Sequence, residues 1–258
     1  MKHGAWNLTV QSVLLPKAGL RPSECEDAIG IREDHRRFCV ADGATEAFDS
    51  RRWARLLTKH WVASQGILTR EELGVWGQAL AKRFENRWAK KSLPWYAEEK
   101  AQGGAFAAFV GLAFLHSTEG LAWQMVALGD SCLIHKRQGA IIEATPLSDP
   151  AAFGFHPILL PSKVLQQQEI IDNFIITTGH AECGDVFFLL SDAIAAWYLQ
   201  EMRATDSGRA THFERLVAVG DRNGVQEVIA CERQKQTLRN DDVAIVRVAV
   251  GDPTTKAG

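Results

Sequence analysis

The chain has 258 residues and a formal net charge of −2, with 46% hydrophobic and 23% charged residues. This composition is typical of a soluble globular protein, and a chain of this length can bury a large core without disulfides or a structural metal. The near-neutral charge gives no global attraction to nucleic acid or membranes, and no apolar stretch is long enough to span a bilayer. We therefore expect neither nucleic acid nor a membrane among the partners.

The five cysteines are odd in number, and no two have C-x-x-C spacing. A disulfide framework and a zinc site are therefore not expected, and reduced thiols indicate a cytoplasmic protein. The first eleven residues lack the apolar core of a signal peptide. We expect one domain over residues 1–250 and a disordered tail over 251–258.

Strand-like alternation begins the chain, and two further strands are predicted at 27–31 and 38–41 around a charged turn. The period then becomes helical, with one apolar face formed by Trp53, Leu56, Leu57 and Trp61. A capping box at residues 69–72 opens a second helix that ends before Pro94. Its apolar face is Leu73, Trp76, Leu80, Phe84 and Trp88. Helix-face spacing favours core packing over ligand stacking for these tryptophans.

The rest of the chain is predicted to be mainly strands. Apolar runs bounded by turn residues lie at 105–115, 121–128, 132–136, 140–144, 170–177, 186–190 and 243–250. Helices are expected at 193–200 and over much of 211–235. Because strands and helices are clustered rather than alternating, the sequence predicts an α+β fold with antiparallel sheets and helices packed outside.

Acidic residues stand at the ends of the predicted strands in five places. They are Glu26 with Asp27, then Asp42, Asp130, Asp192 and Asp241. Carboxylates that converge repel one another, and they remain ionised only when cations lie between them. Oxygen-only ligands favour Mg²⁺ or Mn²⁺, and no histidine lies beside Asp42, Asp192 or Asp241 to suggest zinc.

Each of these positions alone has a plain structural explanation. An aspartate at a strand end is usually a turn residue that bonds its own backbone, and Asp42-Gly43 is a common turn dipeptide. The joint pattern is what favours a metal site. Gly43 is a further candidate ligand, because a residue without a side chain lets its carbonyl approach a metal closely.

The ordered motifs CEDA, VADGATE, VALGDSCLIHKRQG, LLSDAIAAW and NDDVAIVRV resemble the metal-dependent protein phosphatases of type 2C, the PPM family, and most of all its compact bacterial branch. The resemblance covers residues 6–250. It implies an α/β/β/α sandwich of two antiparallel sheets flanked by helices. It also implies a serine/threonine phosphatase that uses a water activated by two Mn²⁺ or Mg²⁺ ions, with a weak third metal site.

The resemblance assigns roles to individual residues. Asp42 would bridge the two metals, and Asp192 and Asp241 would bind the first. The Gly43 carbonyl would bind the second. The remaining acidic residues would hold waters of the second metal or a third ion: Glu26, Asp27 and Asp130. Expected partners are a phosphorylated protein and a cognate serine/threonine kinase.

Several positions depart from the family pattern. Ala44 stands where some members have a histidine that acts as a general acid, and Ala193 and Ala196 weaken the third metal site. Pro22 stands where the family has its phosphate-binding arginine, and Arg21 is one residue earlier. We interpret Arg21 as the candidate phosphate clamp, and a solvated loop residue remains the alternative.

Two other functions stay open on the sequence alone. One is a catalytically degenerate phosphatase that binds phosphoproteins as a scaffold, which the departures favour. The other is a metal-dependent hydrolase of a different ester on the same fold. Against a scaffold, three converging carboxylates would cost stability without a metal to bind. The pairs Arg36-Arg37 and Arg51-Arg52 are interpreted as solvated faces.

Overall fold

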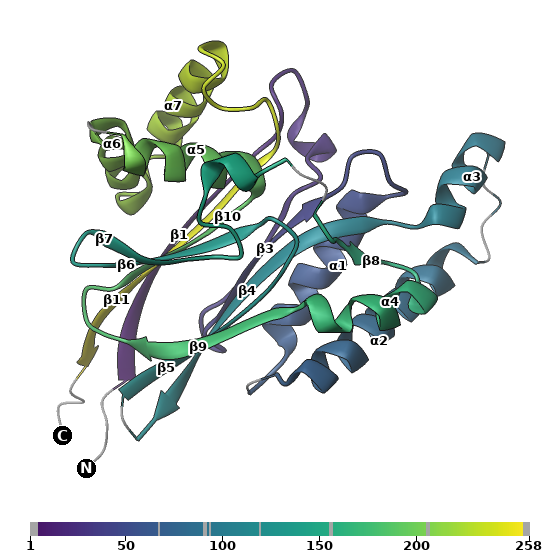
Figure 1. The fold of residues 1–258 in the computed structure, drawn as a ribbon, viewed down its shortest axis with the longest axis horizontal. Helices are drawn as coiled ribbons and strands as arrows, with labels where there is room; N and C mark the ends of the chain where they lie inside the picture. Colours follow the sequence, from purple (N-terminus) through teal and green to yellow (C-terminus); the bar gives the residue numbers. More distant parts are fainter. Residues whose placement is uncertain are drawn as a thin grey trace.

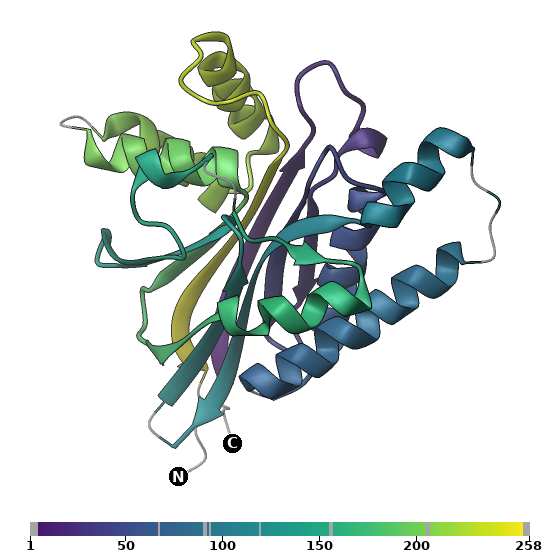
Figure 2. The same ribbon diagram turned by 45° about the vertical axis from the view of Figure 1, so that its right-hand side comes forward.

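The computed structural model describes residues 5–66, 68–89, 92, 94–118, 120–154, 157–204 and 207–254. Two antiparallel sheets pack face to face, with helices on both outer faces (Figures 1 and 2). This is the four-layer α/β/β/α sandwich that the sequence predicts. None of the helices in the described residues is long and apolar enough to cross a membrane.

The first sheet has the order β1-β11-β10-β6-β7. Its strands are β1 (Ala5–Leu15), β6 (Cys132–Arg137), β7 (Ala140–Thr145), β10 (Val186–Leu190) and β11 (Val243–Thr254). The second sheet has the order β2-β3-β4-β5-β9, with the short β8 paired to β4. Its strands are β2 (Ala28–Arg32), β3 (Arg37–Gly43), β4 (Phe106–Ser117), β5 (Gly120–Leu128), β8 (Leu160–Pro161) and β9 (Ile175–Ala181).

Each sheet has its own helical layer, and Figure 1 shows the two layers on opposite sides of the strands. The second sheet is covered by α1 (Ser50–Ala63), α2 (Arg70–Trp88) and α4 (Val164–Ile170), with α3 (Trp95–Gly103) beside them. The first sheet is covered by α5 (Asp192–Arg203), α6 (Gly208–Ala218) and α7 (Arg222–Gln234). Short 3₁₀ turns complete the described elements at Pro22–Glu24, Pro150–Ala152 and Ile171–Asn173.

Alternation along the strands produces three separate apolar layers. In β3, Phe38 and Val40 face the other sheet, whereas Cys39 and Ala41 face the helices. Trp61 is fully buried in the helical layer, and its indole N–H donates to the Phe38 carbonyl at 3.0 Å. The large buried rings therefore fix α1 firmly on the sheet that carries Asp42.

Most predicted elements are confirmed, including the Thr69–Glu72 capping box that opens α2. The strand predicted at 170–177 is wrong at its start, because Ile170 ends α4 and β9 begins only at Ile175. The sequence prediction also missed α3 and α4. The expected tail is wrong for residues 251–254, which continue β11, and Pro253 and Thr254 pair with the start of β1. Residues 255–258 lie outside the described chain.

Candidate active site

The acidic residues named in the sequence lie at the ends of different strands of both sheets. Asp42 is the next-to-last residue of β3, and Asp27 directly precedes β2. Asp130 follows β5, Asp192 opens α5 after β10, and Asp241 lies just before β11. Strand ends are positioned by the sheet behind them, so each carboxylate has a rigid base.

Four of these carboxylates line one cleft with a volume of about 230 Å³. Its lining includes Asp42, Asp130, Asp192 and Asp241, together with Gly43, Ala44 and Thr45 of the loop after β3. Asp27 is buried next to this group, with only 1% of its surface exposed. The structure therefore brings together residues that are more than 200 positions apart in the chain.

The carboxylates strongly affect one another's protonation. Burial raises the pKa of Asp42 well above its usual range, and the charges of Asp27, Asp192, Asp130 and Asp241 raise it further. Burial, followed by the Asp242 charge, likewise raises the pKa of Asp27 well above its usual range. Burial, and then Asp192, raises the pKa of Asp130 to about 6. The cluster thus has more negative charge than its surroundings compensate.

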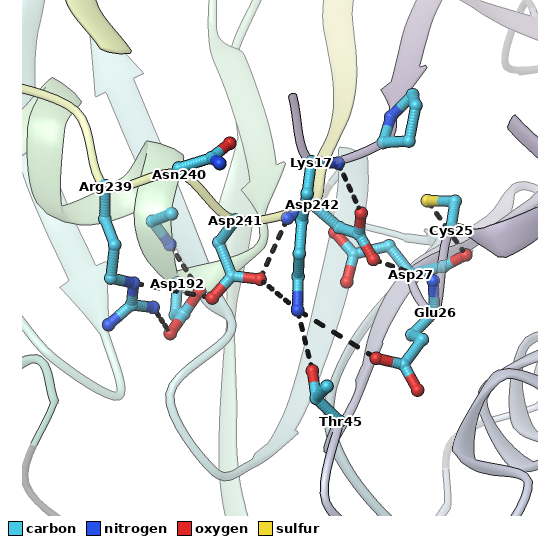
Figure 3. A network of polar contacts seen from close by, with 12 residues as sticks. Lys17, Cys25, Glu26, Asp27, Thr45, Asp192, Arg239, Asn240, Asp241 and Asp242 are labelled. Atoms are coloured by element: carbon cyan, nitrogen blue, oxygen red, sulfur yellow. Dashed lines mark hydrogen bonds and ion pairs between the residues drawn. The ribbon is translucent and has the colours of Figure 1, made fainter. Parts of the chain in front are cut away.

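Two basic side chains reach into this cluster (Figure 3). The Lys17 ammonium lies 3.1 Å from Asp241 Oδ1 and 3.9 Å from Glu26 Oε2, and it donates to the Thr45 hydroxyl at 2.7 Å. Arg239 forms an ion pair with Asp192 and lies 3.4 Å from Asp241 Oδ2. The carboxylates raise the pKa of Lys17 and of Arg239, although burial, the largest single effect on each group, acts in the opposite direction. Lys17 and Arg239 were missed in the sequence, where nothing in their local pattern marks them.

Asp242 holds the loop between β1 and β2 against the start of β11. Its Oδ1 accepts the backbone N–H of Lys17 and its Oδ2 accepts that of Glu26, both at 2.7 Å. Asn240 accepts the backbone N–H of Ala18 at 2.8 Å in the same way. This loop carries both Lys17 and Glu26, so Asp242 positions two groups of the cluster at once. The sequence prediction assigned no role to Asp242.

The backbone packs so closely around position 43 that only glycine fits there. A Cβ built on Gly43 would lie 2.9 Å from the carbonyl oxygen of Ser50 and 3.0 Å from that of Glu26. Both neighbours are backbone atoms, so they cannot move aside easily. Any larger residue at this position would displace the loop that forms one wall of the cleft.

Arg21 lies apart from this network. It is exposed at the start of the 3₁₀ turn Pro22–Glu24, and its backbone N–H donates to the Glu24 carboxylate at 2.8 Å. Within the described residues, no ion pair joins Arg21 to the carboxylates of the cleft, whereas Lys17 and Arg239 both form such pairs. The cations that the structure places in the cluster are Lys17 and Arg239.

The chemistry of the cluster fits hard divalent cations, although its side chains are not arranged around one. In the part of the chain that the structure describes, no three acidic, histidine or cysteine side chains are placed as ligands of a single ion. Among the same residues, neither carboxylate oxygen of Asp27 accepts a hydrogen bond of normal geometry, although both oxygens are buried. Oxygen donors with excess negative charge and unsatisfied buried atoms are suited to Mg²⁺ or Mn²⁺.

Comparisons with known proteins identify the family and the fold. The family model described as Protein phosphatase 2C matches residues 21–232. No curated protein sequence matches the chain significantly.

Several solved bacterial phosphatases share the fold. The Mycobacterium tuberculosis serine/threonine phosphatase PstP/Ppp is 14% identical, with a TM-score of 0.59 over 95% of this chain and 99% of the other. A PstP catalytic domain solved in complex with two manganese ions is also 14% identical, with a TM-score of 0.54 over 95% of this chain and 100% of the other. The S. agalactiae serine/threonine phosphatase is 13% identical, with a TM-score of 0.58 over 94% of this chain and 99% of the other.

Identities this low show a common fold only, so the family assignment depends on the sequence model. That model spans most of the chain and includes four of the five strand-end acidic positions, Asp241 lying just beyond it. The chain belongs to the protein phosphatase 2C family.

Proposed function

We propose that this protein is a serine/threonine phosphatase that hydrolyses phosphomonoesters on other proteins, with two Mn²⁺ or Mg²⁺ ions in the carboxylate cleft. The single observation that supports this most strongly is the convergence of carboxylates from separate strand ends of both sheets on one cleft. The family's phosphatases support the reaction class. The expected partners are a phosphorylated protein and the serine/threonine kinase that modifies it.

The residue roles in this proposal come from the family pattern, and the shared cleft supports them. Burial and the charges of four neighbouring carboxylates raise the pKa of Asp42, and Asp42 would bind both ions. Asp192 and Asp241 would hold the first ion, and the Gly43 carbonyl would hold the second. The waters of the second ion, and a weak third ion, would be held by Glu26, Asp27 and Asp130. When bound, the ions would supply a nucleophilic water near neutral pH and neutralise charge on the phosphoryl group.

The chain's own cations would position the phosphate. Lys17 and Arg239 lie on opposite sides of Asp241, as Figure 3 shows, and both can donate to phosphoryl oxygens. The planar guanidinium of Arg239 can donate two parallel hydrogen bonds to a phosphoryl group, whereas the Lys17 ammonium is a compact single charge. Arg21, the arginine expected from the sequence, would need the loop between β1 and β2 to rearrange before it could take this role.

The experiment compares hydrolysis of p-nitrophenyl phosphate and of a phosphothreonine peptide in EDTA and after addition of Mn²⁺ or Mg²⁺. We expect no turnover in EDTA and recovery with the metal. Asp42→Asn should remain inactive, whereas Asp34→Asn, which changes an exposed aspartate outside the cleft, should behave as wild type. Full activity in EDTA would contradict the proposal.

A phosphoprotein-binding scaffold is the second candidate, and one observation favours it. Lys17 and Arg239 already pair with Asp241 and Asp192, so part of the negative charge is balanced without a metal. Isothermal titration with Mn²⁺ separates the two functions. A scaffold would bind a phosphopeptide without turnover and would show no saturable Mn²⁺ binding that Asp42→Asn removes.

A further inference from the structure

A groove of about 270 Å³ lies between α1 and α2 on the outer side of the helical layer. Its lining is unusual because every charged residue in it is basic. The charged lining residues are Arg52, Arg55 and Lys59 of α1 with Arg83 and Arg87 of α2. Figure 1 places both helices on the same side of the second sheet. The whole chain has a net charge of −2, so this concentration of positive charge is a local feature.

The cations come from one face of each helix. Arg52, Arg55 and Lys59 are three and four residues apart, and so they form a single row along α1. Arg83 and Arg87 are four residues apart and form the facing row on α2. The groove thus has two basic rims that point toward the same space.

In the part of the chain that the structure describes, four of the five basic side chains have no carboxylate partner. Arg52 pairs with Asp49 at 2.8 Å, and Arg83 contacts the His60 ring at 3.1 Å. Within the described residues, Arg55, Lys59 and Arg87 form no ion pair with a carboxylate. Burial lowers the pKa of His60, and the charges of Arg83 and Lys59 lower it further. Like charges three and four residues apart on one helix face repel each other, and a bound anion would relieve this repulsion.

The floor and the length of the groove suit a short peptide. Leu56 and Phe84 line it between the two rims and offer apolar contact. From Arg52 to Lys59 the row rises about 10 Å, which matches roughly three residues of extended chain.

The first turn of α1, which carries Arg52, contacts the loop that lines the cleft, since Ser50 Oγ donates to the Ala44 carbonyl at 2.7 Å. Gly43, Ala44 and Thr45 line the cleft, the same loop runs on to Asp49, and Arg52 lies in the first turn of α1. One extended polypeptide could therefore contact both places.

We propose that the groove of Arg52, Arg55, Lys59, Arg83 and Arg87 is a docking site for an acidic segment of the phosphoprotein substrate. The proposal rests on the phosphatase function above and adds a substrate preference to it. The occupant would carry glutamate, aspartate or further phosphorylated residues near the residue that is dephosphorylated. The small volume of the groove and its apolar floor favour a peptide over nucleic acid, which needs many phosphate contacts along its backbone.

Binding can be measured separately from catalysis. The probe is a fluorescein-labelled, unphosphorylated glutamate-rich peptide, compared by fluorescence anisotropy with a matched glutamine peptide. Lys59→Gln/Arg87→Gln should bind the glutamate peptide about 3- to 20-fold more weakly, as expected for two partly exposed charge contacts. The control Lys82→Gln/Lys100→Gln removes the same charge from exposed positions outside the groove lining and should bind as wild type. Binding should weaken with added salt.

Steady-state kinetics tests whether the groove contributes to substrate binding during turnover. For a phosphothreonine peptide flanked by glutamates, the groove variant should raise KM by a similar factor while kcat stays unchanged. Hydrolysis of p-nitrophenyl phosphate should not change, because that substrate is too small to reach the groove. Absence of all hydrolysis would reject the phosphatase function, and the anisotropy result would still test the groove.

Three outcomes would overturn the docking proposal. One is equal affinity of the groove variant and the control for the glutamate peptide. Another is equal binding of the glutamate and glutamine peptides by the wild type. The third is an oligonucleotide that binds more tightly than the peptide and loses affinity in the groove variant, which would assign the groove to nucleic acid. If the double variant unfolds at a lower temperature than the control, Arg55→Gln alone provides the same comparison.

Discussion

The ammonium group of Lys17 lies 3.1 Å from a carboxylate oxygen of Asp241, although 223 residues separate them in the chain. The contact joins the loop after β1 to the loop that precedes β11, and it places a positive charge beside Asp241 and Thr45, which both line the cleft. Because the same ammonium also donates to Thr45, it lies between the two walls of the site. Lys17 is therefore well placed to contact a phosphoryl group.

We expect Lys17→Ala to lower kcat/KM for p-nitrophenyl phosphate by about 1.5–3 kcal/mol, the value of a hydrogen bond to a charged group. The measurement is steady-state kinetics at saturating Mn²⁺, with Mn²⁺ affinity determined by calorimetry. A change in Mn²⁺ affinity with unchanged kinetics at saturation would mean that Lys17 only balances the carboxylates.

Arg21→Ala distinguishes between the two candidate phosphate clamps. Because Arg21 is exposed and forms no ion pair with the cleft carboxylates in the described chain, we expect kcat/KM to change by less than about 0.5 kcal/mol. The same kinetic assay as for Lys17→Ala applies. A loss as large as that of Lys17→Ala would show that the loop rearranges on substrate binding and that Arg21 is the clamp.

Asp42→Asn should abolish turnover and should stabilise the metal-free protein. Burial, and then the charges of the neighbouring carboxylates, raise the pKa of Asp42 well above its usual range, so an ionised Asp42 is unfavourable at neutral pH without a metal. Removal of that charge should raise the free energy of unfolding in EDTA by about 1–3 kcal/mol. Urea denaturation in EDTA and in Mn²⁺ is the measurement. A destabilised variant in EDTA would show that the negative charge is already compensated in the apo protein.

The layers and strand ends of this fold were predictable because both depend on local patterns. Alternating apolar residues and helix-face tryptophans identify the strands and α1, and the carboxylates follow directly from those strands. The charge partners were not predictable. Lys17 and Asp242 lie in an ordinary loop and an ordinary turn, and only the pairing of β1 with β11 brings them together.

The arginine pairs show the same limit. Arg36-Arg37 and Arg51-Arg52 were interpreted as solvated faces, which is wrong for Arg37. It is 2% exposed and lies over the Trp61 ring at 4.8 Å, and it donates to the Gly66 carbonyl. A long side chain can bury its stem and its planar head against an aromatic ring, and no sequence period reports this.

Asp242→Ala should affect both stability and substrate binding. It would leave the backbone N–H groups of Lys17 and Glu26 without their acceptors and free the loop that carries both side chains. We expect a loss of about 2–4 kcal/mol in the free energy of unfolding and an increase in KM. Urea denaturation and kinetics test this, with the exposed Asp172→Ala as the control. A variant as stable as the control would mean that water replaces both hydrogen bonds at no net cost.

The stability of the metal-free protein should have an unusual pH dependence that Asp130 helps to cause. Burial, followed by the charge of Asp192, raises the pKa of Asp130 to about 6, whereas the ordinary value is 3.8. Between these two pH values the folded protein keeps a proton that the unfolded chain has lost. The unfolded state binds fewer protons there, so stability contributed by Asp130 falls as pH rises from about 4 to about 6. At pH values above the pKa of Asp130 in the folded protein, this contribution to stability is lost completely.

The test compares wild type with Asp130→Asn by urea denaturation in EDTA across that pH range. Burial lowers the pKa of His135, so the contribution of His135 to stability rises with pH, opposite to that of Asp130. Both proteins contain His135, so its contribution cancels when the variant is subtracted from wild type. We expect the free energy of unfolding of wild type to decline relative to the variant by about 2 kcal/mol between pH 4 and pH 7. Added Mn²⁺ should abolish the difference in slope, since a bound cation favours the ionised carboxylate. If the free energies of unfolding of the two proteins in EDTA changed with pH in parallel, the pKa of Asp130 would not be raised in the folded protein.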